Sequence, residues 1–189
     1  GDELLVAGYV HDAYSDSDFA LASYHANGEL VSTFGESGTV VTECPFENDD
    51  YARAVAVQAD GKIVVAGTTE GDLALARYET NGSLDESFGS GGTIVTDFGD
   101  APALASALAL QSDGKIVVVG QSNIYTQPGF AVVRYDSSGA LDPSFGEGGK
   151  VVVDLLAGSE WYDDSLAVAL QADGKIVVAG AGGPESFAL

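Results

Sequence analysis

Lys62-Ile63-Val64-Val65-Ala66-Gly67 is the stretch of sequence that decides the fold. It returns as Lys115-Ile116-Val117-Val118-Val119-Gly120 and as Lys175-Ile176-Val177-Val178-Ala179-Gly180, and Glu3-Leu4-Leu5-Val6-Ala7-Gly8 is a weaker copy. Successive copies lie 53 to 60 residues apart in the chain of 189 residues. A period of this length is typical of repeat proteins, in which each repeat forms one small structural unit.

Three other segments recur between these copies, and in the central repeat they are Thr93–Phe98, Ser106–Gln111 and Phe130–Tyr135. Each is short, rich in aliphatic and aromatic residues and bounded by Gly, Asn, Asp or Ser, which is the pattern of a β-strand. The alanine-rich run Leu104–Leu110 has the composition of a helix, but its counterparts lead directly into a hairpin. We therefore expect strands throughout.

Each copy of the Lys-Ile-Val segment is preceded by a turn sequence, namely Gln58–Lys62, Gln111–Lys115 or Gln171–Lys175. All three place Asp-Gly between two apolar runs. This dipeptide favours a two-residue type I′ turn, in which both central residues have positive φ. The sequence therefore predicts three antiparallel hairpins.

In the central repeat we expect Thr93–Phe98 to pair with Ser106–Gln111, Ser106–Gln111 to pair with Ile116–Gly120, and Ile116–Gly120 to pair with Phe130–Tyr135. Four short antiparallel strands per repeat indicate an all-β array of β-propeller blades, with a β-solenoid as the alternative. Fourteen such strands make about three and a half blades in one array, 1–189. The array divides into a half repeat, two repeats and a repeat truncated in its last strand: 1–38, 39–92, 93–149 and 150–189.

An incomplete set of blades leaves apolar edges exposed. We therefore expect either a fragment of a longer repeat protein or a subunit whose ends are covered head-to-tail by neighbouring copies. The absence of methionine and of a secretion signal at Gly1-Asp2-Glu3 is consistent with a processed chain or a piece of a longer one.

The combination of Leu141-Asp142-Pro143-Ser144-Phe145-Gly146 with the hairpin segments and with Phe130–Tyr135 resembles the bacterial delta-60 repeat family. The resemblance covers essentially the whole chain and implies a secreted or surface protein of propeller-like tandem repeats, without a defined activity. The first copy departs from the pattern, because Val31-Ser32-Thr33 replaces the Asp-Pro-Ser segment and Ser23 replaces the arginine.

Two charged positions recur with the blades, Arg77 with Arg134 and Asp85 with Asp142. Recurrence at the period of the blade indicates a structural role. The sequence predicts an ion pair between blades or a turn cap at these positions.

The composition excludes several functions. Seven basic and 29 acidic residues give a net charge of −22, which repels nucleic acid and other polyanions. No apolar run has the length of a membrane span, and a content of 46% apolar residues indicates a soluble globular protein. The single cysteine, Cys44, cannot form a disulfide within the chain.

The loops that precede Ser106 and Phe130 and their counterparts vary between repeats, and together with the adjoining strand ends they carry sixteen acidic residues against one basic residue, Arg53. Short-spaced carboxylates supply the oxygen ligands that calcium prefers. Calcium is therefore a candidate cofactor, and a solvated acidic surface without a cofactor is the alternative. The candidate metal ligands are Asp12, Asp16, Asp18, Glu47, Asp49, Asp50, Asp163 and Asp164.

Aromatic residues share these variable loops with the acidic residues. Rings that stack on sugars, beside carboxylates that accept hydrogen bonds from hydroxyls, suit a carbohydrate, and such a face also suits a protein ligand. The alternative is that the rings pack the loops down. The candidate ligand-binding residues are Tyr14, Phe46, Tyr51, Tyr125, Trp161 and Tyr162.

No catalytic residue is assigned, because the only two histidines, His11 and His25, fall on opposite faces of the expected blade and no nucleophile motif is present. We expect a non-catalytic scaffold, extracellular or on the bacterial cell surface, that serves binding, adhesion or assembly. A polysaccharide-active enzyme that uses two of the loop carboxylates is the alternative.

Overall fold

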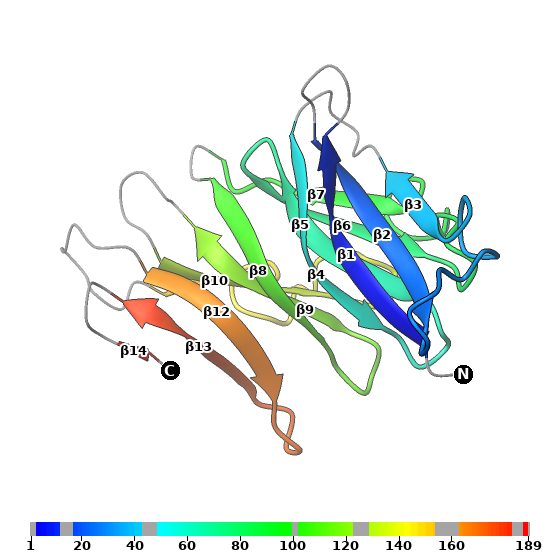
Figure 1. Cartoon of the computed structure of the whole chain (residues 1–189). Helices are drawn as coiled ribbons and strands as arrows, with labels where there is room; N and C mark the ends of the chain where they lie inside the picture. Colours follow the sequence, from blue (N-terminus) through cyan, green and yellow to red (C-terminus); the bar gives the residue numbers. More distant parts are fainter. Residues whose placement is uncertain are drawn as a thin grey trace. The chain divides into compact units, whose positions relative to one another are not determined.

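The structure, a computed structural model, describes residues 3–11, 17–42, 49–99, 102–122, 129–153, 163–182 and 187–188. Within these residues the regular elements are β-strands, and they form four antiparallel sheets of sequential strands (Figure 1). The fold is therefore all-β, a propeller-like repeat array, as the sequence predicts. Leu104–Leu110 lies within a strand, as its counterparts indicated.

The four sheets contain three or four strands each. The first contains β1 (Glu3–His11), β2 (Ser17–His25) and β3 (Thr39–Thr42). The second contains β4 (Asp50–Val57), β5 (Ile63–Thr69), β6 (Asp72–Tyr78) and β7 (Thr93–Thr96). The third contains β8 (Ala103–Leu110), β9 (Ile116–Ser122), β10 (Gly129–Tyr135) and β11 (Lys150–Val153). The fourth contains β12 (Asp163–Leu170), β13 (Ile176–Gly182) and β14 (Phe187–Ala188).

One predicted strand pairing is wrong. We expected Thr93–Phe98 to pair with Ser106–Gln111, but β7 joins the preceding sheet beside β6, and β8 pairs with β9. In the same way β3 pairs with β2 and β11 with β10. Each four-stranded sheet thus ends with the strand that the sequence assigns to the following repeat.

The passage from β6 to β7 explains this pairing, because it folds back onto the strand that it leaves. Arg77 N donates to Gly92 O at 2.9 Å, and Asp85 N donates to Arg77 O at 2.9 Å. Phe88 N then donates to Asp85 O at 2.9 Å. These hydrogen bonds return the chain to the edge of β6, so β7 adds to the existing sheet.

The three Asp-Gly hairpins are present, but their turn type differs from the prediction. Gln58 N donates to Lys62 O at 2.8 Å, which leaves a loop of three residues, Ala59, Asp60 and Gly61. Gly61 adopts a positive φ of 89° and Asp60 does not, so the loop is a type I turn followed by a glycine bulge. The residue before Asp-Gly supplies the extra position that a two-residue type I′ turn lacks.

The chain divides into two compact units, formed by Gly1–Glu70 with Ala74–Val95 and by Gly71–Leu73 with Thr96–Leu189. In the first unit, Phe19 and Leu21 of the first sheet pack with Ile63 and Val65 of the second in one buried apolar cluster. Tyr78 is fully buried, and its Oη donates a hydrogen bond to Thr42 Oγ1 across the two sheets at 2.9 Å.

The second unit repeats this organisation. Val117 and Val119 of the third sheet pack with Ile176 and Val178 of the fourth. Burial raises the pKa of the Tyr135 phenol, and its oxygen lies 2.6 Å from Thr96 Oγ1, as in the pair of Tyr78 and Thr42. The recurring Tyr–Thr pair is therefore part of the repeat structure.

The part of the chain that the structure describes contains no apolar helix of membrane-spanning length.

Candidate functional site

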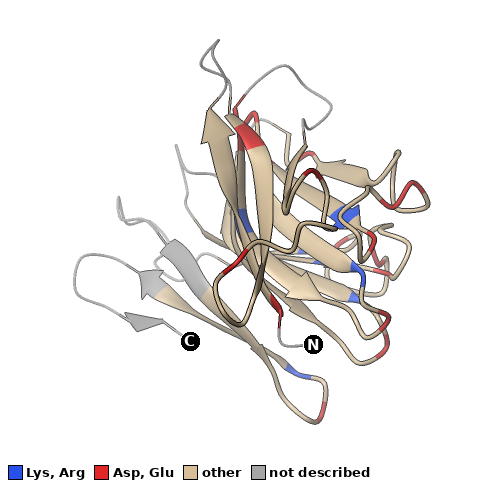
Figure 2. Cartoon of the chain, turned by 45° about the vertical axis from the view of Figure 1, so that its right-hand side comes forward, with Lys and Arg blue, Asp and Glu red and all other residues tan. Residues whose placement is uncertain are grey.

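The two ends of each sheet differ in chemistry. At the constant end lie the Asp-Gly hairpins and the passages that follow Tyr24, Tyr78 and Tyr135, whose sequences repeat. At the variable end β1, β5 and β9 terminate, and the sequences that connect them to the next strands differ in length and composition. Most of the acidic residues coloured in Figure 2 lie in turns and at strand ends. A recognition site is therefore expected among these charged ends rather than in the sheet interiors.

The constant end of the second sheet contains a charged cluster around Asp85, whose side chain is 4% exposed. Its Oδ2 accepts hydrogen bonds from Arg77 Nε at 2.7 Å and from Lys62 Nζ at 2.8 Å. Its Oδ1 accepts hydrogen bonds from Ser87 N at 3.1 Å and Ser87 Oγ at 2.6 Å. The Arg77 guanidinium also lies 4.3 Å over the ring of Phe88. The sequence prediction of a turn cap is thus confirmed, but the ion pair lies within one sheet and not between blades.

Burial raises the pKa of Asp85, but the hydrogen bonds from Lys62, Ser87 and Arg77 lower it by more. The pKa of Asp85 consequently lies well below its ordinary value, and the carboxylate is charged at neutral pH. Because both oxygens of this carboxylate accept hydrogen bonds inside the sheet, Asp85 acts in folding and not as a ligand-binding group.

The third sheet repeats the cluster with a looser geometry. Asp142 accepts hydrogen bonds from Arg134 Nε at 2.9 Å and from Ser144 Oγ at 2.6 Å. Lys115 Nζ lies 3.9 Å from Asp142 and is closer to Asp113, at 2.8 Å. In the first sheet the arginine and aspartate are replaced by Ser23 and Val31, and Val31 is buried in the apolar core. The charged pair is thus present or absent as a unit, which indicates a structural role.

The variable end of the first unit contains a different kind of polar network. Ser17 is fully buried, and its Oγ donates a hydrogen bond to Asp49 Oδ1 at 2.8 Å. The Nδ1 atom of His11 lies 2.9 Å from the same Oγ. Ser17 and His11 meet because they are directly opposite in the pairing of β1 with β2, whereas Asp49 immediately precedes β4. Ser17 therefore links two neighbouring sheets.

Two tyrosines extend this network over the surface. The ring of Tyr9 lies edge-on to His11, with centroids 5.4 Å apart, and edge-on to Tyr51, with centroids 4.9 Å apart. Tyr9 is 45% exposed, and the Arg53 guanidinium lies 5.4 Å over the Tyr51 ring. We call Tyr9, His11, Ser17, Asp49 and Tyr51 together the Tyr9–Tyr51 cluster.

The cluster combines a serine, a histidine and an aspartate, but it does not have the arrangement of a hydrolase nucleophile. The single hydroxyl proton of Ser17 goes to Asp49, so His11 Nδ1 donates its proton to Ser17 Oγ. A nucleophilic serine needs the opposite arrangement, in which histidine accepts that proton, and also needs access to a substrate. The cluster is suited to recognition, because aromatic edges, an imidazole and a carboxylate meet on one surface.

The structure describes six of the fourteen predicted site residues, although for Asp163 and Asp164 it describes only the backbone, in β12. It brings Tyr51 and Asp49 together in the cluster. Asp50 is 1% exposed in β4, whereas Asp18 pairs with Val10 and therefore faces away from Ser17. The other predicted residues lie outside the described part: Tyr14, Phe46, Tyr125, Trp161, Tyr162, Asp12, Asp16 and Glu47.

Three members of the cluster, Tyr9, His11 and Ser17, were not predicted as site residues. The alternation of β1 provides the missing signal, because Tyr9 and His11 share the face of Leu5 and Ala7, which pack toward the core. Among the described residues no three side chains of His, Cys, Asp or Glu are placed to hold a metal ion. Because the structure describes the side chains of only three of the eight predicted calcium ligands, Asp18, Asp49 and Asp50, calcium binding stays a prediction.

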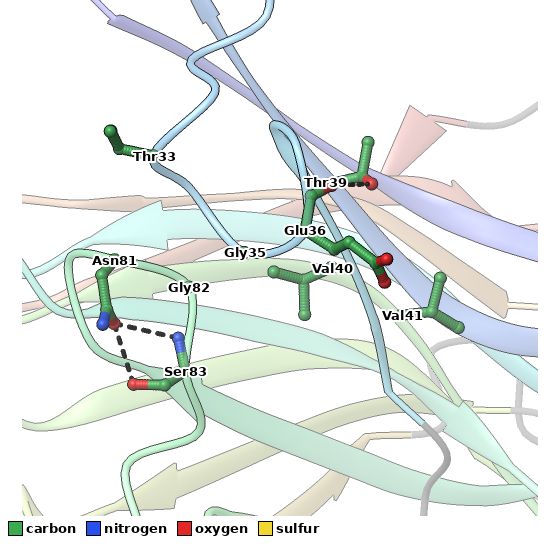
Figure 3. Close-up of a pocket in the computed structure, with 9 residues that line it drawn as sticks. All are labelled: Thr33, Gly35, Glu36, Thr39, Val40, Val41, Asn81, Gly82 and Ser83. Atoms are coloured by element: carbon green, nitrogen blue, oxygen red, sulfur yellow. Dashed lines mark hydrogen bonds between the residues drawn. The ribbon is translucent and has the colours of Figure 1, made fainter.

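An open pocket of about 420 Å³ lies at the constant end of the first unit (Figure 3). The turn Asn81–Ser83 lies beside Gly35 and Val40, and Gly35 N donates to Asn81 O at 2.8 Å. The pocket follows from the packing of this repeated turn against β3. Its lining residues are Thr33, Gly35, Glu36, Thr39, Val40, Val41, Asn81, Gly82 and Ser83.

The comparison with protein families agrees with the fold. Residues 58–88, 111–145 and 171–187 match the family described as a domain of unknown function (DUF5122) beta-propeller. Each matched segment begins at the glutamine before an Asp-Gly hairpin, so the match recurs with the repeat. The chain is thus a β-propeller-type repeat protein, similar to a family whose function is not defined. A search of curated proteins finds no match.

Proposed function

We propose that this chain is a non-catalytic binding module and that the Tyr9–Tyr51 cluster holds its ligand. The observation that carries the proposal is that two neighbouring sheets bring the exposed ring of Tyr9, the half-buried ring of Tyr51, an imidazole and a carboxylate together at the variable end. At the constant end, by contrast, the charged side chains of Lys62, Arg77 and Asp85 pair with one another inside the second sheet. At the variable end the side chains of His11 and Asp49 are exposed and can bind a ligand.

A neutral carbohydrate is the ligand class that this chemistry fits best. The exposed ring of Tyr9 offers an apolar surface for a sugar ring, and Asp49 has carboxylate oxygens that accept hydrogen bonds from hydroxyls. The net charge of −22 disfavours acidic polysaccharides. The buried hydroxyl of Ser17 fixes the orientation of both His11 and Asp49, which lowers the entropic cost of binding.

The test is titration calorimetry of the chain with a panel of neutral oligosaccharides, beside a uronic acid oligomer. Tyr51→Ala removes an aromatic contact worth about 1 kcal/mol and is expected to weaken binding roughly fivefold. Tyr24→Ala is the matched control, because it removes a half-buried tyrosine of the same sheet pair at the constant end. Equal affinity of the wild type and Tyr51→Ala for every sugar bound would contradict the proposal.

Calcium is proposed as a second ligand of the variable end. The support is chemical, because the carboxylates of the predicted set are hard oxygen ligands and Asp49 and Asp50 are adjacent at the start of β4. The expected result is a melting temperature that rises with millimolar calcium and returns to its initial value with EDTA. Magnesium at the same concentration is the control, and an equal response to both ions, or to neither, would refute a specific site.

We further propose that the protein belongs to the delta-60 repeat type and acts outside the cell, in adhesion or assembly. The resemblance of the repeat segments to that family supports the location. A calcium-dependent acidic loop surface also fits an environment in which calcium is millimolar. Antibody labelling of intact and of permeabilised source cells tests the location, and signal only after permeabilisation would contradict it.

A further inference from the structure

One face of the first sheet is apolar and uncovered. Leu4, Val6 and Val41 are 62%, 46% and 56% exposed, whereas Leu5 and Ala7, which alternate with them, pack toward the second sheet. The strand register adds further apolar residues to the uncovered face, because residues directly opposite in an antiparallel pair share a face. These are Ala20, Ala22 and Tyr24, which lie opposite Gly8, Val6 and Leu4.

The residues of the uncovered face correspond, in the repeat, to residues of the second sheet that the first sheet covers. In the repeat, Leu4 and Val6 correspond to Ile63 and Val65, which are 3% and 0% exposed because the first sheet packs on them. In the same way Ala20, Ala22 and Tyr24 correspond to Ala74, Ala76 and Tyr78, which belong to the buried cluster. The face is therefore built to be covered by another sheet of the same repeat.

The open space over Gly8, which we call the recess at Gly8, shows what a covering sheet would bring. Its counterpart Gly67 leaves room for the ring of Phe19, since a Cβ atom on Gly67 would lie 2.5 Å from Phe19 Cζ. A Cβ atom on Gly8 would meet nothing within 4 Å. The first sheet thus presents an empty recess at the position where the second sheet receives a phenylalanine from its neighbour.

The fourth sheet carries the complementary residues. Ile176 and Val178 of β13 pack toward the third sheet, so Val177 and Ala179 face away from it. In the repeat they stand where Leu5 and Ala7 stand in the first sheet. Phe187 stands where Phe19 stands, because Phe187 pairs with Ala181 as Phe19 pairs with Tyr9.

From this complementarity we infer that the uncovered face of the first sheet is a docking surface for the fourth sheet of a second copy of this chain, with the backbone position of Phe187 in the second copy opposite the recess at Gly8. The contact is head-to-tail, so each copy keeps one unused face and the assembly extends beyond a dimer unless it closes into a ring. Because each copy carries a net charge of −22, added salt promotes this association.

Sedimentation of the full chain over a wide range of concentrations tests the inference. The wild type is expected to exceed the mass of one chain, 19.2 kDa, and to grow with concentration and salt. Gly8→Val adds a side chain whose Cβ atom meets nothing within 4 Å in the free chain, and Val6→Lys places a charge on the face, so both variants are expected to stay monomeric. Val152→Lys is the matched control, because Val152 is 51% exposed in β11, outside the proposed contact, and this variant is expected to assemble like the wild type.

A mixing experiment tests the head-to-tail geometry itself. Val177→Lys places a charge on the outward face of the fourth sheet and Gly8→Val impairs the first sheet, so each variant alone is expected to be monomeric. An equimolar mixture of the two is expected to form one-to-one dimers and nothing larger, because only one intact pair of faces remains. A monomeric wild type at every concentration, assembly that Gly8→Val leaves unchanged, or a mixture without dimers would each overturn the inference.

Discussion

Asp85→Asn is the change that tests the charged cluster of the second sheet most directly. The asparagine keeps an oxygen for Ser87 but turns an amide group, a hydrogen-bond donor, toward Arg77 and Lys62, which are donors as well. Removing one partner of a buried ion pair costs about 3 to 5 kcal/mol. Lys62 is 24% exposed and retains its 2.7 Å contact with Glu79, so the expected loss is at the lower end, about 3 kcal/mol.

The first sheet supplies the matched control for this change. It replaces the arginine and aspartate by Ser23 and Val31, so the double variant Arg77→Ser with Asp85→Val copies a solution that the chain already uses. Because the double variant leaves no unpaired arginine, its expected loss of stability falls to about 1 to 2 kcal/mol. This loss reflects the hydrogen bonds from Ser87 to Asp85 and the stacking of Arg77 on Phe88. The double variant is therefore expected to be more stable than Asp85→Asn alone.

Urea unfolding followed by circular dichroism gives the free energies of unfolding, provided that the slope m is the same for all variants. The reasoning fails if Asp85→Asn costs less than about 1 kcal/mol, because the carboxylate would then be solvated and not paired. It also fails if the double variant loses at least as much stability as Asp85→Asn. Asp142→Asn in the third sheet is expected to lose less than Asp85→Asn, because Lys115 lies 3.9 Å from Asp142.

Three further predictions concern the same unit. The lowered pKa of Asp85 contributes stability that is complete above the ordinary carboxyl pKa of about 4 and is lost as the pH falls below that value. The wild type and Asp85→Asn are therefore expected to converge in stability when urea unfolding is measured at increasingly acid pH. A constant difference between them would contradict the ion pair. Tyr78→Phe leaves the buried hydroxyl of Thr42 without its donor and is expected to lower the free energy of unfolding in urea by about 1 to 2 kcal/mol. An unchanged midpoint would mean that water replaces the phenol hydroxyl. Gly67→Ala drives a methyl group against Phe19 and the backbone oxygen of Tyr51 and is expected to lower stability by about 3 kcal/mol. Gly8→Ala, measured below the concentration at which copies associate, is expected to leave stability unchanged. Equal effects of the two variants would refute the difference between the covered and uncovered faces.

The sequence alone was sufficient to identify the strands and hairpins, because the residues that specify them are neighbours in the chain. The segments Ile63–Thr69 and Ile116–Ser122 follow Asp-Gly turns at the predicted positions. The turn type was missed because the residue before Asp-Gly, such as Ala59, also belongs to the loop, and its conformation depends on which residues pair across the hairpin.

The candidate site was only partly predictable. Tyr51 and Asp49 carried a local signal, since acidic and aromatic residues gather in variable loops. The alternation of β1 places His11 on the face of Leu5 and Ala7, but no local signal indicates that His11 meets Ser17, because this contact arises from the register of β1 with β2. The contact of Ser17 with Asp49 arises from the packing of two sheets. Residue spacing along a chain does not encode which side chains meet across sheets.

The amino-acid sequence by itself determined the repeat, the all-β class and the division of charge between recurrent and variable segments, because these follow from local periodicity and composition. Only the tertiary structure decided that β7 completes the sheet of β6, that Asp85 is neutralised within its own sheet and that Gly8 faces an empty recess. These features depend on hydrogen bonds and packing between residues that are distant in the chain, and such contacts are fixed only when the whole repeat is folded.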